Sequence, residues 1–512
     1  MNTAEKLNSQ ASLLELIRGY RETCDAEASI LEIVVRGVHL DSRLLQQGDL
    51  FLACFGRNHD ARNYIDQAIA SGCCAILVES GGDWQGIELR DAVPIIAIDN
   101  LHAKISEISG RFFGHPSKKL NVIGITGTNG KTSCSQFLSQ TLTALGYKCG
   151  VIGTLGYGIS GELQETQLTT PDAVFTQSAL ARMHCEDINP IAMEVSSVGL
   201  HQKRVSSVLF DTAIFTNLTR DHLDYHETME AYGENKKKLF MMPGLKTAIV
   251  NLDDSFALSI INSVSSDVEV LTYSLENKIA SVFAESLELT RNGFRAKICT
   301  PIGMGEITGK LIGYFNFSNV LAVLTALINY LPRHSGMNID SICQKISELQ
   351  PVDGRMEIIE ESEEITVVVD YAHTPDGLCS ALTALKDHFS GQIWCIFGCG
   401  GNRDKGKRPL MGEIAEKHSS QIVITDDNPR NEGGDEIVQH ILSGISWKEN
   451  IKIIRDRAKA ISYAISQAKA GDVVLVAGKG HETYQDIAGI RNIFSDAKQV
   501  RVALQEREGK GR

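Results

Sequence analysis

Residues 120–132 read Leu-Asn-Val-Ile-Gly-Ile-Thr-Gly-Thr-Asn-Gly-Lys-Thr, and this stretch decides the fold class. The apolar run that ends at Thr126 predicts a buried strand, and a helical pattern occupies residues 133–145. The glycines between them allow backbone N–H groups to approach an anion, toward which the positive end of the helix also points. The stretch therefore predicts a strand, a phosphate-binding loop and a helix, an arrangement typical of α/β proteins.

The loop is a variant of the usual phosphate-binding pattern. That pattern has a glycine five residues before Gly130, whereas this chain has Ile125 there and Gly124 one residue earlier. A glycine-rich turn without a ligand is the alternative. Nucleotide binding is the better interpretation, because the lysine of such a loop reaches the β and γ phosphates and the next hydroxyl reaches a magnesium ion. The residues expected to bind ATP here are Gly127, Thr128, Asn129, Gly130, Lys131 and Thr132.

The length and the patterns around this loop predict three domains. A chain of 512 residues with 43% hydrophobic and 22% charged residues is typical of a globular protein with more than one domain. Breaks near residues 113–119 and 331–354 divide it into residues 1–115, 116–350 and 351–512. We expect an α/β fold in all three: an N-terminal α/β domain, a central P-loop ATPase-like domain with a mostly parallel sheet, and a C-terminal Rossmann-like domain.

The composition argues against two classes of partner. The formal charge of −13 argues against nucleic-acid binding, which rests on a basic surface. No apolar run approaches the roughly 18 to 20 residues that span a bilayer, and the first residues do not resemble a signal peptide. The 12 cysteines lack metal-binding or redox spacings, which favours reduced thiols. We expect a cytoplasmic monomer without a membrane span.

Polar residues follow two further apolar runs of the central region. Glu194 closes one run, and Asn217, Asp221 and His222 come after the next. Both sets should lie beside the phosphate-binding loop, where a carboxylate and an imidazole could hold a divalent cation. Each has an ordinary alternative, namely a solvated acid, a surface histidine and, for residues 236–238, the wet face of a helix.

The segment Asp427-Asn428-Pro429-Arg430 follows a short strand-like run at residues 421–425. Asparagine before proline is restricted to extended backbone, so an ordinary turn is one interpretation. The C-terminal end of a strand is, however, where open α/β sheets bind ligands. Because the planar fork of arginine matches a carboxylate, Arg430 indicates a carboxylate ligand.

Read together, many ordered segments resemble the Mur ligase family of peptidoglycan biosynthesis over nearly the whole chain. They lie at residues 40–43, 127–132, 169–172, 193–197, 217–226, 354–357, 370–373, 398–409, 427–430 and 478–482. The resemblance implies an ATP-dependent amide ligase that uses Mg²⁺ and forms an acyl phosphate. Its implied substrates are ATP, UDP-N-acetylmuramoyl-L-alanyl-D-glutamate and an amino acid.

The resemblance also implies site residues. The catalytic set is Lys131, Glu194, His222 and Lys236, and the metal set is Thr132, Glu194, His222 and a carbamylated Lys236. Beyond the loop, the ATP site would include Asn217 near the adenine, Asp370 on the ribose, Arg355 and His373. The UDP-sugar dipeptide would contact Ser42, Thr169, Thr170, Ser196, Arg204 and Lys236. A carbamylated lysine needs a neutral amine, so the pKa of Lys236 should be depressed.

The implied amino acid is meso-2,6-diaminopimelate. Family members that add it carry Asn-Pro-Arg at this place, whereas lysine-adding relatives differ there. Diaminopimelate keeps a carboxylate and an ammonium at its far end, and lysine keeps only the ammonium. The residues expected to bind it are Arg403, Asp427, Asn428, Pro429, Arg430, Gly478 and Glu482. The alternatives are a lysine-adding or folylpolyglutamate-type ligase and a P-loop NTPase that acts as a switch or scaffold.

Two positions depart from the family pattern. Val198 stands where a histidine is common, with His201 as a possible substitute, and Ala61 stands where glycine is usual. If the backbone at Ala61 needed a positive φ, the alanine would be strained. Neither position belongs to the predicted ATP or metal residues, so we expect an active enzyme.

Overall fold

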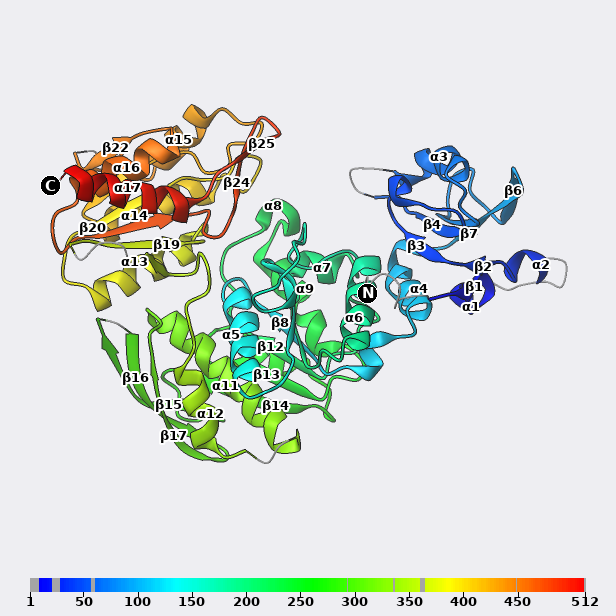
Figure 1. Ribbon diagram of the computed structural model, residues 1–512, viewed down its shortest axis with the longest axis horizontal. Helices are drawn as coiled ribbons and strands as arrows, with labels where there is room; N and C mark the ends of the chain where they lie inside the picture. The colour runs from blue at the N-terminus through cyan, green and yellow to red at the C-terminus, as the bar shows by residue number, and fades with distance from the viewer. Residues whose placement is uncertain are drawn as a thin grey trace.

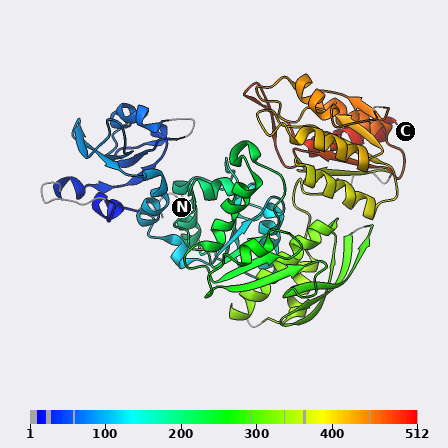
Figure 2. The same ribbon diagram turned by 180° about the vertical axis from the view of Figure 1, so that it is seen from behind.

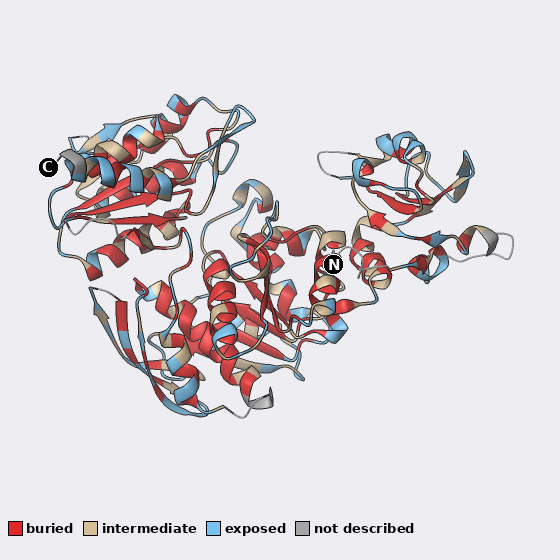
Figure 3. Cartoon of the chain, viewed as in Figure 1, coloured by how far each residue is buried: buried red, intermediate tan, exposed pale blue. Residues whose placement is uncertain are grey.

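The computed structural model describes residues 9–20, 28–56, 60–291, 293–334, 337–359, 364–447 and 449–510. Three bodies, each built on one large sheet, follow one another along an arc, from the blue N-terminal body to the red C-terminal body (Figures 1 and 2). Each of the proposed ranges 1–115, 116–350 and 351–512 encloses one of these sheets. The strands of the sheets are mostly buried between covering helices (Figure 3).

The N-terminal body contains a five-stranded sheet in the order β3-β4-β5-β7-β6. Its strands are β3 (Gly37–His39), β4 (Asp49–Ala53), β5 (Ala75–Glu79), β7 (Val93–Ile98) and the antiparallel edge strand β6 (Ile87–Arg90). The other elements are β1 (Ala11–Ser12), β2 (Val34–Val35), α1 (Leu13–Ile17), α2 (Ala28–Leu31), α3 (Ile65–Ala70) and α4 (Ile105–Phe112). The expected α/β texture of this region is confirmed.

The central body is a ten-stranded sheet in the order β10-β9-β11-β8-β12-β13-β14-β15-β16-β17. The strands from β9 to β14 run parallel, and β15 pairs with β14 in parallel. The antiparallel pairs are β10 with β9 at one edge, and β15 with β16 and β16 with β17 at the other. Its strands are β8 (Val122–Thr126), β9 (Gly150–Gly153), β10 (Gly156–Ile159), β11 (Ile191–Glu194), β12 (Thr212–Phe215), β13 (Thr247–Asn251), β14 (Glu269–Ser274), β15 (Val282–Thr290), β16 (Gly293–Thr300) and β17 (Gly303–Gly309). Its helices are α5 (Lys131–Ala144), α6 (Ala173–Cys185), α7 (Ser197–His201), α8 (Leu223–His226), α9 (Met229–Lys237), α10 (Ala257–Ile261), α11 (Tyr314–His334) and α12 (Ile339–Ser347).

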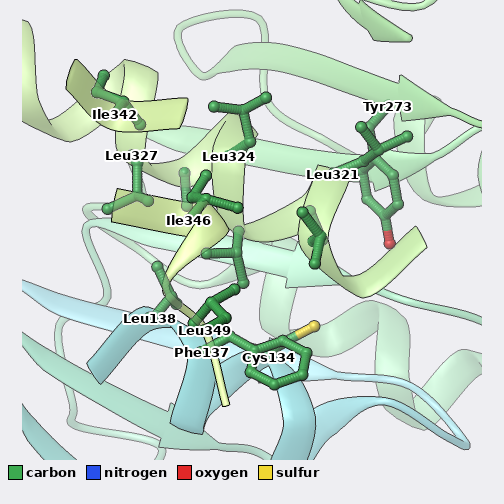
Figure 4. Packing of buried hydrophobic residues seen from close by; sticks show 14 of the residues in the cluster. Cys134, Phe137, Leu138, Tyr273, Leu321, Leu324, Leu327, Ile342, Ile346 and Leu349 are labelled. Carbon is green, nitrogen blue, oxygen red and sulfur yellow. The ribbon is translucent and has the colours of Figure 1, made fainter. Parts of the chain in front are cut away.

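Helix α11 corrects one sequence-based expectation. Over Tyr314–Leu331 it is long and apolar enough, by length and composition, to cross a membrane, although no run of that length was expected. Its window is 72% buried inside the protein. Leu321, Leu324 and Leu327 pack among side chains of α5 and α12 (Figure 4). The helix therefore has the burial of a core helix.

The C-terminal body is a six-stranded sheet in the order β18-β19-β23-β20-β21-β22, parallel except for the edge strand β18. Its strands are β18 (Glu357–Ile359), β19 (Thr366–Asp370), β20 (Ile393–Phe397), β21 (Gln421–Ile424), β22 (Ile451–Ile453) and β23 (Val473–Ala477). Its helices are α13 (Pro375–His388), α14 (Lys407–His418), α15 (Gly434–Leu442), α16 (Arg457–Gln467) and α17 (Asp496–Lys510). A separate hairpin joins β24 (Tyr484–Ile487) to β25 (Ile490–Ile493). The expected Rossmann-like sheet is confirmed.

Candidate active site

The phosphate-binding loop joins the buried strand β8 to helix α5 at the middle of the central sheet. Gly127 has a φ of 154° and Gly130 a φ of 87°. A Cβ atom on Gly127 would lie 1.9 Å from Thr216 Oγ1, and one on Gly130 would lie 2.4 Å from Asn319 Oδ1. Only glycine fits at either position, so the loop keeps its backbone open to an anion.

Lys131 and Thr132 begin helix α5 at this loop. Lys131 Nζ donates to the carbonyls of Gly127 and Thr128 at 2.9 and 2.8 Å, so the ammonium lies folded back over the loop. Thr132 Oγ1 donates to Glu194 Oε2 at 3.0 Å, where Glu194 is the buried last residue of β11. The loop, the hydroxyl and the carboxylate are therefore adjacent.

The second predicted set follows strand β12, on the other side of β8. Asn217 Oδ1 accepts from the Asn129 backbone N–H at 2.9 Å, so this amide holds the loop. Asp221 Oδ2 lies 3.5 Å from His222 Nε2 and 3.9 Å from His373 Nε2. Burial opposes ionisation of Asp221, but these two histidines and Lys407 hold its pKa well below the ordinary value.

Lys236 lies beneath the loop on helix α9 and is 1% exposed. Its Nζ donates to the Gly127 carbonyl at 2.7 Å and lies 4.3 Å from the centre of the Tyr232 ring. Burial, and then the nearby charge of Lys131, lower the pKa of Lys236 well below its ordinary value. The wet helix face that was the alternative is therefore excluded for this lysine, and its environment favours a neutral amine.

These residues line one cavity of about 560 Å³ between the central and C-terminal bodies. The C-terminal body contributes Arg355, Asp370 and His373. Arg355 Nη2 donates to Thr132 Oγ1 at 3.2 Å, and its guanidinium lies over the ring of Tyr371 at 4.3 Å. Asp370 accepts from the backbone N–H groups of Met356 and Ala372 at 2.7 and 2.8 Å, which orients its carboxylate.

The residues expected to hold the UDP-sugar dipeptide lie in two places. Thr169 and Ser196 line the same cavity, and Thr170 Oγ1 donates to the Glu194 carbonyl at 2.9 Å. Arg204 Nη1 donates to the Thr170 carbonyl at 2.6 Å. Ser42 lies in the N-terminal body instead, where its hydroxyl donates to Gln67 Oε1 at 3.1 Å. A ligand that reaches both places would have to be long.

The residues expected to hold the amino acid gather at the C-terminal ends of β21 and β23. Asn428 Nδ2 donates to Glu482 Oε2 at 2.8 Å. Arg430 Nη1 donates to the Gly401 carbonyl at 2.8 Å and Arg403 Nη1 to the Asn402 carbonyl at 3.4 Å. Among the described residues, neither guanidinium has a carboxylate partner. The guanidiniums of Arg403 and Arg430 thus lie beside the Asn428 amide and the Glu482 carboxylate, which orient each other through their hydrogen bond.

Asp427, Pro429 and Gly478 complete this cluster. Asp427 Oδ1 accepts from the backbone N–H of Asn428 at 2.7 Å, and its Oδ2 is buried with no hydrogen-bond partner among the described residues. A Cβ atom on Gly478 would lie 2.6 Å from that oxygen. Pro429 is buried and supplies no N–H. These three residues shape the loop.

One residue of the cluster, Lys479, is not among those predicted from the sequence. Lys479 is fully buried, and its Nζ donates to Glu482 Oε2 at 2.6 Å and to Asn428 Oδ1 at 3.0 Å. It stands inside the segment 478–482 that carries part of the family resemblance. A lysine in a polar segment gives no sign of burial, so only its place between Gly478 and Gly480 could have drawn attention to it.

The two departures from the family pattern have different settings. Ala61 opens a 3₁₀ helix at Ala61–Tyr64 and is not among the described residues with positive φ, so the strain considered for it is absent. The neighbouring residues 57–59 lie outside the described part of the chain. Val198 lies half-buried in α7, and His201 Nδ1 lies 2.8 Å from the Tyr225 hydroxyl.

Comparison with known proteins gives concordant matches. A family model described as the Mur ligase middle domain matches residues 125–327, and one described as Mur ligase, glutamate ligase domain matches residues 354–480. The UDP-N-acetylmuramoyl-L-alanyl-D-glutamate–2,6-diaminopimelate ligase of Coxiella burnetii is 44% identical over 93% of this chain and 97% of that protein. The ligase of the same name from Pseudomonas aeruginosa is 44% identical over 92% of this chain and 96% of that protein.

Two solved structures complete the comparison. A structure of a UDP-N-acetylmuramoyl-L-alanyl-D-glutamate–2,6-diaminopimelate ligase has a TM-score of 0.68 and 33% identity, and the match covers 98% of this chain and 99% of that one. Folylpolyglutamate synthase of Mycobacterium tuberculosis has a TM-score of 0.62 at 16% identity, covering 78% of this chain and 95% of that one. The second likeness shows a shared fold alone.

Proposed function

This chain belongs to the Mur ligase family of ATP-dependent amide ligases, and from that premise we propose that it adds meso-2,6-diaminopimelate to UDP-N-acetylmuramoyl-L-alanyl-D-glutamate. The reaction would take place in the cytoplasm and supply a precursor for peptidoglycan, on which cell shape and division depend. One observation carries the proposal. Arg403 and Arg430 lie without a carboxylate partner among the described residues, beside the paired Asn428 and Glu482.

The activation step brings anions together. The peptide carboxylate attacks the γ phosphorus of ATP, and the bond to ADP breaks as an acyl phosphate forms. The backbone N–H groups of 127–132 and the helix end would bind the phosphates. Lys131 would leave the Gly127 and Thr128 carbonyls and donate to the phosphate oxygens, where its charge offsets the repulsion between the two anions.

The joining step uses the amine of the incoming amino acid. The neutral amine attacks the acyl carbon and a tetrahedral intermediate forms. Its collapse expels phosphate, and the proton that the nitrogen loses passes to the departing phosphate or to water. Asn428, Arg430 and Glu482 would hold the far end of the amino acid and so aim the amine at the acyl carbon. Such positioning supplies much of the rate in reactions of two bound partners.

The donor set around the loop fits magnesium. Thr132 Oγ1 and Glu194 Oε2 are hard oxygen donors 3.0 Å apart. The described residues contain no group of three His, Cys, Asp or Glu side chains that would bind a metal alone. We therefore propose that Thr132, Glu194, His222 and the carbamate oxygens of Lys236 hold Mg²⁺ together with phosphate oxygens. When bound, the ion supplies positive charge against the transferring phosphoryl group.

The preference for diaminopimelate rests on charge. A far carboxylate would pair with Arg403 and Arg430 while the far ammonium faces Glu482, and lysine offers no such carboxylate. Hydrogen bonds to charged groups contribute about 1.5–3 kcal/mol each, so losing two of them would disfavour lysine by about 10³-fold. A lysine-adding ligase, the runner-up, would leave both guanidiniums without a ligand.

The experiment that tests the proposed function is phosphate release with each substrate omitted in turn. The purified protein is given ATP, Mg²⁺, UDP-N-acetylmuramoyl-L-alanyl-D-glutamate and meso-diaminopimelate. Release should need all of them. Release that continues without the amino acid and the UDP-sugar would favour the NTPase switch and sink the ligase assignment.

A further inference from the structure

We propose that Gln485 and Lys479 are positioning residues that preset the amino-acid loop Asp427–Arg430, and that selectivity for the far carboxylate depends on them. The inference deepens the proposed function and rests on it. Both residues come from the segment after β23, where the hairpin β24–β25 stands apart from the six-stranded sheet (Figure 1). No step of the proposed reaction uses either of them.

The backbone of the loop Asp427–Arg430 is held by hydrogen bonds from the hairpin β24–β25. Arg430 has a φ of 50°, in the left-handed region that side chains other than glycine rarely adopt. Its N–H donates to the Asp486 carbonyl at 3.0 Å, and its carbonyl accepts from the Ala488 N–H at 2.8 Å. The hairpin therefore fixes the direction in which the Arg430 side chain leaves the loop.

Gln485 fixes the start of the same loop. Its Nε2 donates to the Asp427 carbonyl at 2.8 Å and approaches the Asp426 carbonyl at 3.4 Å. Pro429 lacks an N–H, so the loop has one donor fewer with which to stabilise itself. Gln485 and the backbone of Asp486 and Ala488 thus grip the loop at both ends.

Lys479 orients the polar side chains between those ends. Asn428 Oδ1 accepts from Lys479 Nζ at 3.0 Å and from the Asp486 N–H at 2.9 Å. With its oxygen occupied twice, the amide turns Nδ2 toward Glu482 Oε2 at 2.8 Å. Glu482 also receives Lys479 Nζ at 2.6 Å, so one buried ammonium fixes both side chains.

This arrangement has a specific consequence for binding. The amide, the carboxylate and Arg430 are ordered by the hairpin and the lysine before any amino acid arrives, which lowers the cost of ordering them on binding. We call the contacts of Lys479, Gln485, Asp486 and Ala488 with the loop the clamp. Loosening the clamp should weaken binding of the amino acid and leave the ATP loop, which lies on the central body, unaffected.

The test is a comparison of Gln485→Leu with the wild type and with Asn492→Leu. Leucine removes the Gln485 donor at nearly the same volume. Asn492 lies exposed in the same hairpin, and among the described residues its amide reaches only the Ile490 carbonyl at 3.4 Å, so it serves as the matched control. KM for meso-diaminopimelate should rise about tenfold in Gln485→Leu, as expected for about 1.4 kcal/mol. KM for ATP and kcat at saturating amino acid should stay within about twofold of the wild type. Tm should stay within a few degrees of it.

Lys479→Met should produce a larger rise in the same KM and a smaller preference for diaminopimelate over L-lysine. If Gln485→Leu fails to fold, Gln485→Glu replaces it, because it puts an acceptor against the Asp427 carbonyl at equal length. Equal rises in the KM values for ATP and for the amino acid, or no rise in the KM for the amino acid, would overturn the proposal that these residues preset the loop. A wild type that does not use diaminopimelate at all would instead refute the proposed function.

Discussion

Lys236 is buried, whereas an ordinary lysine keeps its charged amine in water. It is 1% exposed, its Nζ donates to the Gly127 carbonyl, and its pKa is lowered by burial and by Lys131. A lowered pKa makes the neutral amine, which reacts with carbon dioxide, available at lower pH than in a free lysine. The environment therefore supports the proposed carbamate.

Carbamylation of Lys236 should be visible by NMR. In ¹³C-bicarbonate near pH 8 the wild type should show one protein-bound carbamate signal. The signal should persist as the pH is lowered toward neutrality, because the depressed pKa of Lys236 keeps the amine neutral. Lys236→Arg should lack the signal and lose about 10²-fold or more in kcat. A wild-type spectrum without the signal would contradict the assignment.

Arg430 should determine how the amino acid is bound and placed, and should leave ATP binding unchanged. Arg430→Ala should raise KM for meso-diaminopimelate by about 10–10²-fold, since a charged hydrogen bond contributes about 1.5–3 kcal/mol. KM for ATP should hardly change. The control is Arg295→Ala, an exposed arginine on β16. An equal loss for ATP and the amino acid would show that Arg430 acts on the fold instead.

Glu227 carries backbone strain between helices α8 and α9. It closes α8 with a φ of 69° and a ψ of −45°, which is unfavourable for a residue with a side chain. Glu227→Gly should therefore stabilise the protein by about 1 kcal/mol, seen as a higher Tm. Glu230→Gly, in the first turn of α9, should destabilise it by a similar amount. Equal destabilisation by both variants would show that the strain is absent.

At the scale of elements, the sequence predicts best the strands and helices whose apolar pattern is clearest. The strand and helix around 120–145 and the parallel strands of the C-terminal body alternate with clear turn residues, and the structure confirms them. The hairpin β24–β25 had no such signal, because Ile490 and Ile493 are three residues apart and point to opposite faces of the strand, where both are exposed. The burial of Lys479 could not be predicted either, because its partner Asn428 lies 51 residues away in the sequence and its partner Glu482 lies three residues away in an irregular segment.

The burial of Glu194 and Lys236 also could not be predicted from single residues. Each type is usually solvated, and only the strand order β11-β8-β12 brings Glu194 beside the loop. The family resemblance indicated these residues before the physical reason was available. The structure supplies that reason in the contacts of Thr132 and Gly127.

An ion pair at the start of α14 braces the loop that carries Arg403. Glu432 Oε2 lies 3.0 Å from Nη1 of the fully buried Arg408, and Glu432 Oε1 accepts from the Asn402 N–H at 2.5 Å. The hydrogen bond from Arg408 and the other nearby donors outweigh burial and lower the pKa of Glu432 from 4.5 to about 2. This shift predicts stability that is present above pH 4.5 and lost as the pH falls toward 2.

Glu432→Gln should therefore lower the free energy of unfolding of the C-terminal body at pH 7 by about 1.5–3 kcal/mol, the usual contribution of a hydrogen bond to a charged group. The difference from the wild type should shrink between pH 4.5 and pH 2, as the wild-type carboxylate takes up a proton. Denaturant unfolding at several pH values measures it. Glu436→Gln, at an exposed partner of Lys405, is the control and should have little effect. A difference that does not depend on pH would refute the ion pair as its cause.

At the scale of the whole molecule, the proposed function would divide the substrates between the three bodies. The ATP loop belongs to the central body, the amino-acid loop to the C-terminal body, and Ser42 to the N-terminal body. Contacts cross between the central and C-terminal bodies, from Arg220 to Asp404 at 3.1 Å and from Asn129 to Asp376 at 3.1 Å. The proposed reaction needs the acyl phosphate and the amine to meet there, so these contacts lie where closure would act.

Competition between two amino acids tests the account most directly. The protein is given ATP, Mg²⁺, UDP-N-acetylmuramoyl-L-alanyl-D-glutamate and equal amounts of meso-diaminopimelate and L-lysine, and the products are separated by mass. We predict the diaminopimelate product in excess by about 10³-fold, because only diaminopimelate has a second carboxylate, at its far end, that can pair with Arg403 and Arg430. Equal amounts of the two products, or lysine product in excess, would contradict the account.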